Sequence, residues 1–187
     1  MMKSSDRYSG LTISLHWLIA LLIIAAFSLG TVMTDMRISP TKLRYYSYHK
    51  WIGITVLAFF AIRLINRLLT KTPSYSPPMP AWQLKASALM HGVLYVLMFA
   101  VPVSGYLYTC AAGYPVVYLG LFELPSLISA NPDIKDTLKE VHETLNYVML
   151  AAVILHVLAA LKHQLIDKDH LFRRMMPGKA RNTISEA

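Results

Sequence analysis

Cysteine is almost absent from this chain of 187 residues: Cys110 is the only one, so no disulfide can form within the chain. No Cys-x-x-Cys-His motif occurs, which excludes a covalently attached c-type haem. Charged residues make up only 15% of the sequence and hydrophobic residues 55%, a balance that excludes a disordered or fibrous chain. Acidic residues are few, since 10 Asp and Glu face 18 Lys and Arg. In so apolar a chain the net charge of +8 indicates positive loops at a membrane face rather than a nucleic-acid surface.

Four long stretches have few or no charged side chains. The first, residues 11–33, has no charge at all and would span about 34 Å as a helix, against roughly 30 Å for a hydrocarbon core. The other three cover about residues 45–69, 86–110 and 142–165. The sequence therefore predicts an all-α integral membrane four-helix bundle, with residues 1–187 as a single membrane domain.

The basic residues between these stretches are unevenly distributed. If the N-terminus lies inside, 12 Lys and Arg are on the inner side and six on the outer side. The positive-inside rule then places both the N- and C-termini in the cytoplasm. The outer segment from Ala111 to Lys139 has room for a short surface helix.

Five of the seven histidines fall in or at the ends of the apolar stretches, as His16, His49, His91, His142 and His156. An ionisable group inside a membrane is energetically costly and indicates a function. For any single histidine, the alternative is a ring that hydrogen-bonds a neighbouring helix.

The spacing of these histidines points to pairs. His142 and His156 are separated by four helical turns, so they share a helix face about 21 Å apart along the axis. Depth in the membrane then pairs His16 with His156 and His49 with His142. Two imidazoles on opposite sides of one metal suit a six-coordinate b-type haem. Zinc and non-haem iron would need further ligands, while copper remains open.

Several short segments carry a family resemblance. They are Ile13–Trp17, His49–Gly53, His142 with His156, and the run His163–Asp169 followed by Leu171–Met175. Together they resemble the bacterial cytochrome b561 family, which extends to superoxide oxidase and to cytochrome b subunits of nickel hydrogenases and formate dehydrogenases. The resemblance implies a multi-pass protein of the bacterial inner membrane that binds two haem b groups. The irons would be held by His16 and His156 on the cytoplasmic side and by His49 and His142 on the periplasmic side.

The resemblance also implies a ubiquinone pocket near the inner haem. His163 would donate to a quinone carbonyl, and His91 and Trp17 would line the same pocket. The alternatives are contact of His163 with lipid headgroups and a bond from His91 to a neighbouring helix. On the outer side, positive charge could steer a small anion to the haem. The residues concerned are Arg37, Lys42, Arg44 and Lys50, and the alternative for them is a solvated loop balanced by acids.

The expected function is electron transfer from a periplasmic donor, a small molecule such as superoxide or a protein, to ubiquinone at the cytoplasmic side. This is the activity of a superoxide:ubiquinone oxidoreductase, with the lipid bilayer and a quinone as partners and no nucleic acid. A first alternative is a cytochrome b electron-transfer or anchor subunit of a periplasmic dehydrogenase or hydrogenase. A second is a haem-free transporter whose histidines relay protons.

Overall fold

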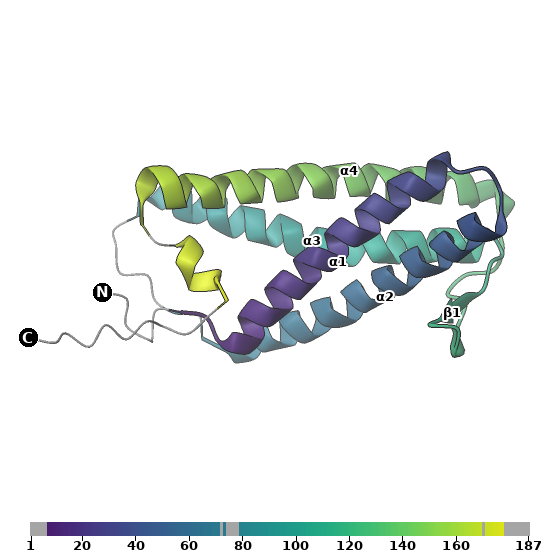
Figure 1. Ribbon diagram of the computed structural model, residues 1–187, viewed down its shortest axis with the longest axis horizontal. Helices are drawn as coiled ribbons and strands as arrows, with labels where there is room; N and C mark the ends of the chain where they lie inside the picture. Colours follow the sequence, from purple (N-terminus) through teal and green to yellow (C-terminus); the bar gives the residue numbers. More distant parts are fainter. Residues whose placement is uncertain (1–6, 72, 74–78, 170, 178–187) are drawn as a thin grey trace, which may run out of the picture.

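The computed structural model describes residues 7–71, 73, 79–169 and 171–177. Its framework is four long helices: α1 (Gly10–Asp35), α2 (Pro40–Leu69), α3 (Ala81–Ala111) and α4 (Pro132–Lys162) (Figure 1). All four are long and apolar enough to cross a membrane. The prediction of an all-α membrane four-helix bundle is therefore confirmed.

Capping residues start three of these elements before the apolar stretches begin. The Ser9 hydroxyl accepts the backbone N–H of Thr12 at the start of α1, at 3.3 Å. Ser39 caps α2 in the same way, and Asn131 caps α4. Since an N-cap satisfies a donor that the helix leaves unpaired, helices begin at such residues rather than where charge ends. Consequently α4 starts at Pro132, ten residues before the apolar stretch that begins at position 142.

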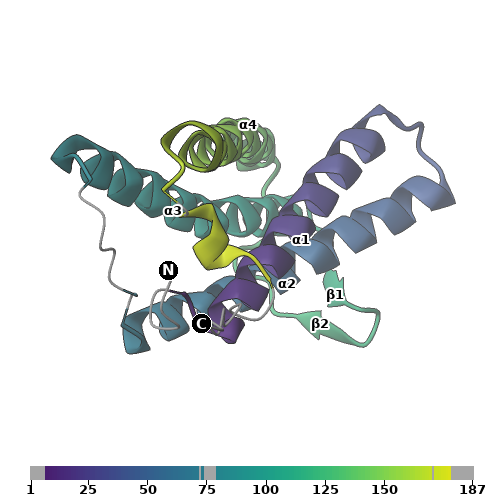
Figure 2. The same cartoon turned by 60° about the vertical axis from the view of Figure 1, so that its left-hand side comes forward.

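The helices pack as two neighbouring pairs around a small central core. α1 lies against α2 and α3 lies against α4 (Figure 2). Residues from all four helices make the core, namely Ile19, Phe60, Leu97, Met98, Met149 and Ala152. Many leucines, isoleucines and valines on the outer faces are exposed, as expected for helices surrounded by lipid.

The segment between α3 and α4 carries a β-hairpin instead of the short surface helix for which the sequence had room. Strand β1 (Val116–Tyr118) pairs antiparallel with β2 (Phe122–Leu124). β-Branched and aromatic residues favour strands, and Gly120 adopts the positive φ of 73° that the tight turn needs. The hairpin rests on α2, where the indole of Trp51 donates to the carbonyl of Val117 at 2.7 Å. We call this end of the bundle the hairpin end.

The opposite end, which we call the terminal end, is closed by the last described residues. α4 continues into a π-helical turn, η2 (His163–Asp167), and the chain then returns as a short 3₁₀ helix, η3 (Phe172–Met175). The Trp17 indole donates to the carbonyl of Met175 at 2.7 Å. The buried Arg174 donates to the carbonyl of Pro73 at 2.6 Å. The first and the last described residues of the chain therefore lie at the terminal end (Figure 1).

Candidate functional site

Two histidine pairs lie inside the bundle, one towards each end. The ring centres of His16 on α1 and His156 on α4 are 6.2 Å apart, with the rings at 68°. Those of His49 on α2 and His142 on α4 are also 6.2 Å apart, at 84°. The structure thus brings together both of the predicted pairs, and α4 contributes one member to each.

The separation within each pair suits a single metal ion between two imidazoles. A metal–nitrogen bond of about 2 Å on each side, plus roughly 1 Å from each nitrogen to its ring centre, adds up to about 6 Å. Each observed 6.2 Å separation matches this sum. Because two imidazoles can bind one haem iron from opposite sides, both separations fit that group.

Hydrogen bonds orient the rings of the hairpin-end pair. Nδ1 of His49 lies 3.0 Å from the carbonyl oxygen of Ala26. Nδ1 of His142 lies 3.0 Å from both the carbonyl oxygen of Val101 and the hydroxyl of Ser104. A carbonyl only accepts, so each Nδ1 carries the proton and each Nε2 keeps a lone pair. The Nε2 of His142 accepts from the side-chain amide of Asn146 at 3.2 Å, a contact that a metal at this position would replace.

A cavity of about 800 Å³ surrounds the hairpin-end pair. This volume lies within the usual range for cofactor pockets. Its wall is mostly apolar and includes Ile23, Phe27, Met33, Val56, Met98 and Met149. Two glycines on this wall, Gly53 and Gly105, present no side chain to the cavity. The lining therefore fits a flat, largely apolar macrocycle between His49 and His142.

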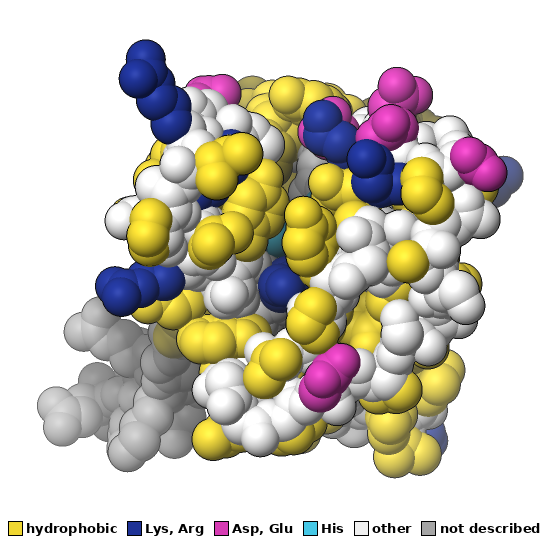
Figure 3. All heavy atoms as spheres, turned by 90° about the vertical axis from the view of Figure 1, so that its right-hand side faces the viewer, with side chains coloured by type: hydrophobic (Ala, Val, Ile, Leu, Met, Phe, Trp, Pro, Cys, Tyr) yellow, Lys and Arg dark blue, Asp and Glu magenta, His cyan; other side chains and the backbone are white. Residues whose placement is uncertain are grey.

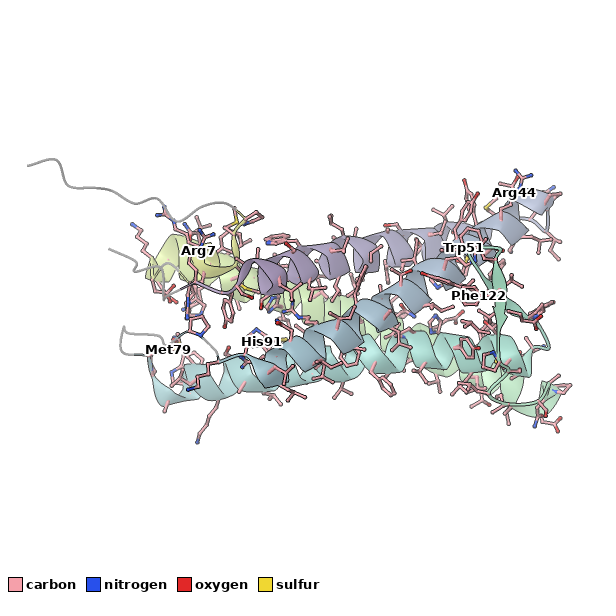
Figure 4. The ribbon with its side chains drawn as sticks, turned by 90° about the horizontal axis from the view of Figure 1, so that it is seen from below. Arg7, Arg44, Trp51, Met79, His91 and Phe122 are labelled. Atoms are coloured by element: carbon pink, nitrogen blue, oxygen red, sulfur yellow. The ribbon has the colours of Figure 1, made fainter. Side chains whose placement is uncertain are left out.

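A third histidine joins the terminal-end pair. The ring centre of His91 lies 5.5 Å from that of His156, and its Nδ1 lies 2.7 Å from the carbonyl oxygen of Ser87. Figure 4 shows His91 in the terminal half of the bundle. Trp17 packs edge-on against His16, with 5.5 Å between ring centres. His91 and Trp17 thus flank the terminal-end pair, and the indole N–H of Trp17 is already engaged by Met175.

His163 lies in the π-helical turn beyond this pair. Its Nδ1 is 2.6 Å from Asp169 and 3.2 Å from Asp167, while Lys162 pairs with Asp167 at 2.5 Å. In the described part of the chain, the polar contacts of His163 are with these carboxylates rather than with Trp17 or His91. A π turn places side chains out of the regular helical register and is frequent at functional sites.

The four basic residues predicted to steer anions separate into two groups. Lys42 and Lys50 line the cavity around the hairpin-end histidines. Arg37 and Arg44 are absent from its lining, and Arg44 points away from the bundle (Figure 4).

A second, polar pocket of about 460 Å³ adjoins this cavity and shares five lining residues with it, among them Lys42. We call it the vestibule; its lining is Thr34, Lys42, Tyr46, Tyr108, Ala112, Tyr114, Lys135, Asp136 and Lys139. Figure 3 looks onto the hairpin end, where hydrophobic side chains and scattered charged ones surround a central hollow in which a histidine is visible. Sequence reasoning missed Lys135 and Lys139, although their spacing to His142 places all three on one face of α4.

Comparison with known proteins identifies the family. The model of the prokaryotic cytochrome b561 family matches residues 7–178. The chain belongs to this family. It is 35% identical over 176 residues to cytochrome b561 homolog 1 of Escherichia coli (strain K12), covering 92% of this chain and 98% of the relative. It is 32% identical over 183 residues to the probable superoxide oxidase CybB of Yersinia pestis, covering 92% and 97% respectively. A further relative, cytochrome b561 homolog 2 of Escherichia coli (strain K12), is 30% identical over 182 residues, 93% of each chain.

Membership in the cytochrome b561 family makes the chain a membrane electron-transfer protein with b-type haem. The family resemblance of the short histidine-containing segments is thereby confirmed. A haem with a histidine on each face has no open coordination position, so such a site exchanges electrons rather than binding oxygen. The geometry of the two histidine pairs agrees with that chemistry at both ends of the bundle.

Proposed function

We propose that the protein is a di-haem cytochrome that takes electrons from superoxide at the hairpin end and delivers them to ubiquinone at the terminal end. The observation that carries this proposal is the equal 6.2 Å separation of two histidine pairs at two depths of one bundle. His49 and His142 would hold one haem, and His16 and His156 the other. When bound, each haem supplies reversible one-electron exchange.

The vestibule supports an anionic donor. Lys42, Lys135 and Lys139 line it with one acid, Asp136. Lys135 pairs with Asp136 and Lys139 with Glu143, each at 3.6 Å, through exposed side chains. A pocket lined by positive charge raises the local concentration of a small anion and its rate of encounter. Two superoxide anions would give two molecules of dioxygen and two electrons. Similarity to a probable superoxide oxidase supports the same donor.

The His163–Asp169 pair supports ubiquinone reduction at the other end. With Nδ1 turned to Asp169, the Nε2 edge of His163 is the edge that would meet a quinone carbonyl. His163 would place a proton on the quinone oxygen and recover one with the help of Asp169. Trp17, fixed by Met175, and His91 would form the wall of the pocket. Two electrons and two protons convert ubiquinone to ubiquinol.

The proposed orientation of the bundle in the membrane rests on the distribution of its basic residues. Basic residues are concentrated at the terminal end, including Arg63, Arg67, Lys71 and Lys162. By the positive-inside rule, this charge supports a terminal end in the cytoplasm and a hairpin end in the periplasm of a bacterial inner membrane.

The test combines cofactor content with electron flow. We expect purified protein to contain two b haems per chain, to be reduced by a superoxide source, and to pass electrons to added ubiquinone. His163→Ala should keep both haems and their reduction by superoxide but lose ubiquinone reduction. Haem reduction no faster than in a control containing superoxide dismutase would reject superoxide as the donor, and a preparation without b-type absorbance would favour the haem-free transporter.

The exposed tip of the hairpin favours one other candidate, an electron-transfer subunit anchored to a periplasmic enzyme. Leu119, Leu121 and Phe122 are 49%, 77% and 53% exposed at the end where a periplasmic donor would dock. Exposed apolar groups of this kind often mark contacts with a partner. Stable co-purification with a large periplasmic dehydrogenase or hydrogenase would decide for this alternative.

A further inference from the structure

The two histidine pairs differ in what holds their Nδ1 atoms. At the hairpin end, both rings are hydrogen-bonded through Nδ1: His49 to Ala26, and His142 to Val101 and Ser104. At the terminal end, neither His16 nor His156 has a hydrogen-bond partner among the described residues; their ring contacts are with other aromatic rings. Each site therefore offers two histidines, but only the hairpin-end histidines are hydrogen-bonded by surrounding residues.

His142 has the most strongly held ring of the four. Its Nδ1–H points to two acceptors at 3.0 Å each. The Ser104 hydroxyl itself donates to the Val101 carbonyl at 2.8 Å, which leaves its oxygen lone pairs free to accept from His142. Ser104 is only 6% exposed, so water does not compete for this bond. Hydrogen bonds in such a low-dielectric interior are stronger than in water.

A hydrogen bond donated by Nδ1 changes the metal on the other side of the ring. It draws the proton away from the imidazole, raises the basicity of Nε2, and makes it a better electron donor to iron. A better donor stabilises the oxidised iron relative to the reduced iron, so the reduction potential falls. The hairpin-end haem should therefore be the harder of the two to reduce.

Charge near the terminal-end pair acts in the same direction. Arg63 is close enough to His16 and His156 to interact with both electrostatically. It also lies 6.0 Å from the ring centre of Tyr95. A nearby cation stabilises the reduced, less positive haem and so raises its potential. At the other end, Lys42 and Lys50 also line the cavity, but their ammonium groups donate to carbonyl oxygens, Lys42 to that of Met36 at 2.6 Å and Lys50 to that of Pro115 at 3.1 Å.

We propose that the hairpin-end haem has the lower reduction potential and that Ser104 is a positioning residue that helps to set it. This inference rests on the proposed pair of haems. One electron would then pass from the hairpin-end iron, which is oxidised, to the terminal-end iron, which is reduced, without any bond or proton changing place. The difference in hydrogen bonding gives electron transfer a direction towards the end that carries the His163–Asp169 pair.

The experiment is a potentiometric titration of the purified holoprotein, followed by b-haem absorbance. Two one-electron steps are expected in the unmodified protein. Ser104→Ala removes one acceptor from His142 without adding volume, so the lower step should rise and the upper step should stay. For a one-electron couple, each tenfold change in the equilibrium between the two haems corresponds to about 59 mV.

Ser47→Ala is the matched control. Ser47 lines the hairpin-end cavity, and its hydroxyl also donates to a helix carbonyl, that of Leu43, but among the described residues it hydrogen-bonds no histidine. Neither step should move in this variant. The low-spin ferric spectrum of Ser104→Ala should also change for one haem only, which a purely structural role of the serine would not produce.

The outcomes separate this inference from the proposed function. A shift of the upper step in Ser104→Ala, or no shift of either step while two haems remain bound, overturns the assignment of potentials but leaves the di-haem proposal standing. A single haem per chain in the unmodified protein overturns both.

Discussion

Gly105 of α3 lies against the imidazole of His142 so closely that a β-carbon at position 105 would be 2.8 Å from Cε1 and 3.1 Å from Nδ1. The lack of a side chain at position 105 therefore leaves the space that the His142 ring occupies. Gly30 of α1 lies close to His49 in the same way, but less tightly: a β-carbon at position 30 would be 3.3 Å from Cε1 of His49.

Gly105→Ala should displace the His142 ring and weaken haem binding at the hairpin end alone. We expect haem content to fall from two towards one per chain, measured as the pyridine haemochrome. Gly92→Ala is the control, because no atom lies within 4 Å of the new β-carbon. That variant should keep both haems and gain about 0.5–1 kcal/mol of helix stability. Full haem content in Gly105→Ala would contradict the placement of the cofactor.

Replacing single histidines should distinguish ligands from neighbours. His142→Ala should lose the hairpin-end haem and His156→Ala the terminal-end haem, each leaving one haem per chain. His91→Ala should retain two, because its Nδ1 is bonded to Ser87 and its proposed place is the quinone pocket wall. Loss of a haem in His91→Ala would show that the terminal-end pair has been assigned to the wrong rings.

Neutralising the vestibule should slow an anionic donor. The double change Lys135→Gln and Lys139→Gln removes two of the positive charges that line the vestibule. We expect the rate of haem reduction by superoxide to fall by about tenfold at low salt, and by less as salt screens the remaining charge.

The matched control for this experiment removes the same charge elsewhere. Arg37→Gln with Arg44→Gln also deletes two positive charges, but neither residue lines the cavity or the vestibule. Its rate should stay close to that of the unmodified protein. Equal slowing by both double variants would mean that net charge, rather than the vestibule, governs the encounter.

Asp169→Asn should separate proton delivery from electron delivery. The substitution keeps the size of the side chain but removes the carboxylate 2.6 Å from Nδ1 of His163. Haem content and haem reduction should be unchanged, while ubiquinone reduction should slow by about 10²-fold, as for loss of a general acid–base group. Stopped-flow absorbance of the haems, with and without quinone, measures both steps. Unchanged quinone reduction would remove this pair from the mechanism.

The buried guanidinium of Arg174 should matter for stability. It donates to the Pro73 carbonyl and stacks on Tyr8, with 5.4 Å to the ring centre. Arg174→Ala should cost about 1–3 kcal/mol and lower the melting temperature in detergent. Arg173→Ala, at an exposed neighbouring position, should have little effect. A similar loss in both variants would indicate a general charge effect.

Much of the bundle could be predicted because its signals are local. Uncharged stretches long enough to span a bilayer predict the four helices, and the spacing of His142 and His156 on one helix predicts two sites at different depths. Helix starts were harder to predict, because capping at Ser39 and Asn131 extends α2 and α4 beyond the apolar residues. The hairpin was missed because each of its strands has only three residues, too few for alternation to stand out in an apolar segment.

The hydrogen-bond partners of the histidine rings could not be predicted from the sequence. Ser104 and His142 are 38 positions apart, and Ala26 and His49 are 23 apart. Such contacts depend on how two helices are rotated against each other, which hydrophobic periodicity does not determine in helices that are apolar on every side. The positions of Lys135 and Lys139 could have been predicted, because helical spacing alone puts them on the face of α4 that carries His142.

One histidine of each pair comes from α4, the last of the four helices in chain order. During biosynthesis, α1, α2 and α3 would enter the membrane with three histidines, His16, His49 and His91, whose neighbouring rings on α4 are not yet present. Neither pair is complete until α4 has been translated and inserted. The two haems of the proposed function should therefore bind late and together, after α4 has been inserted.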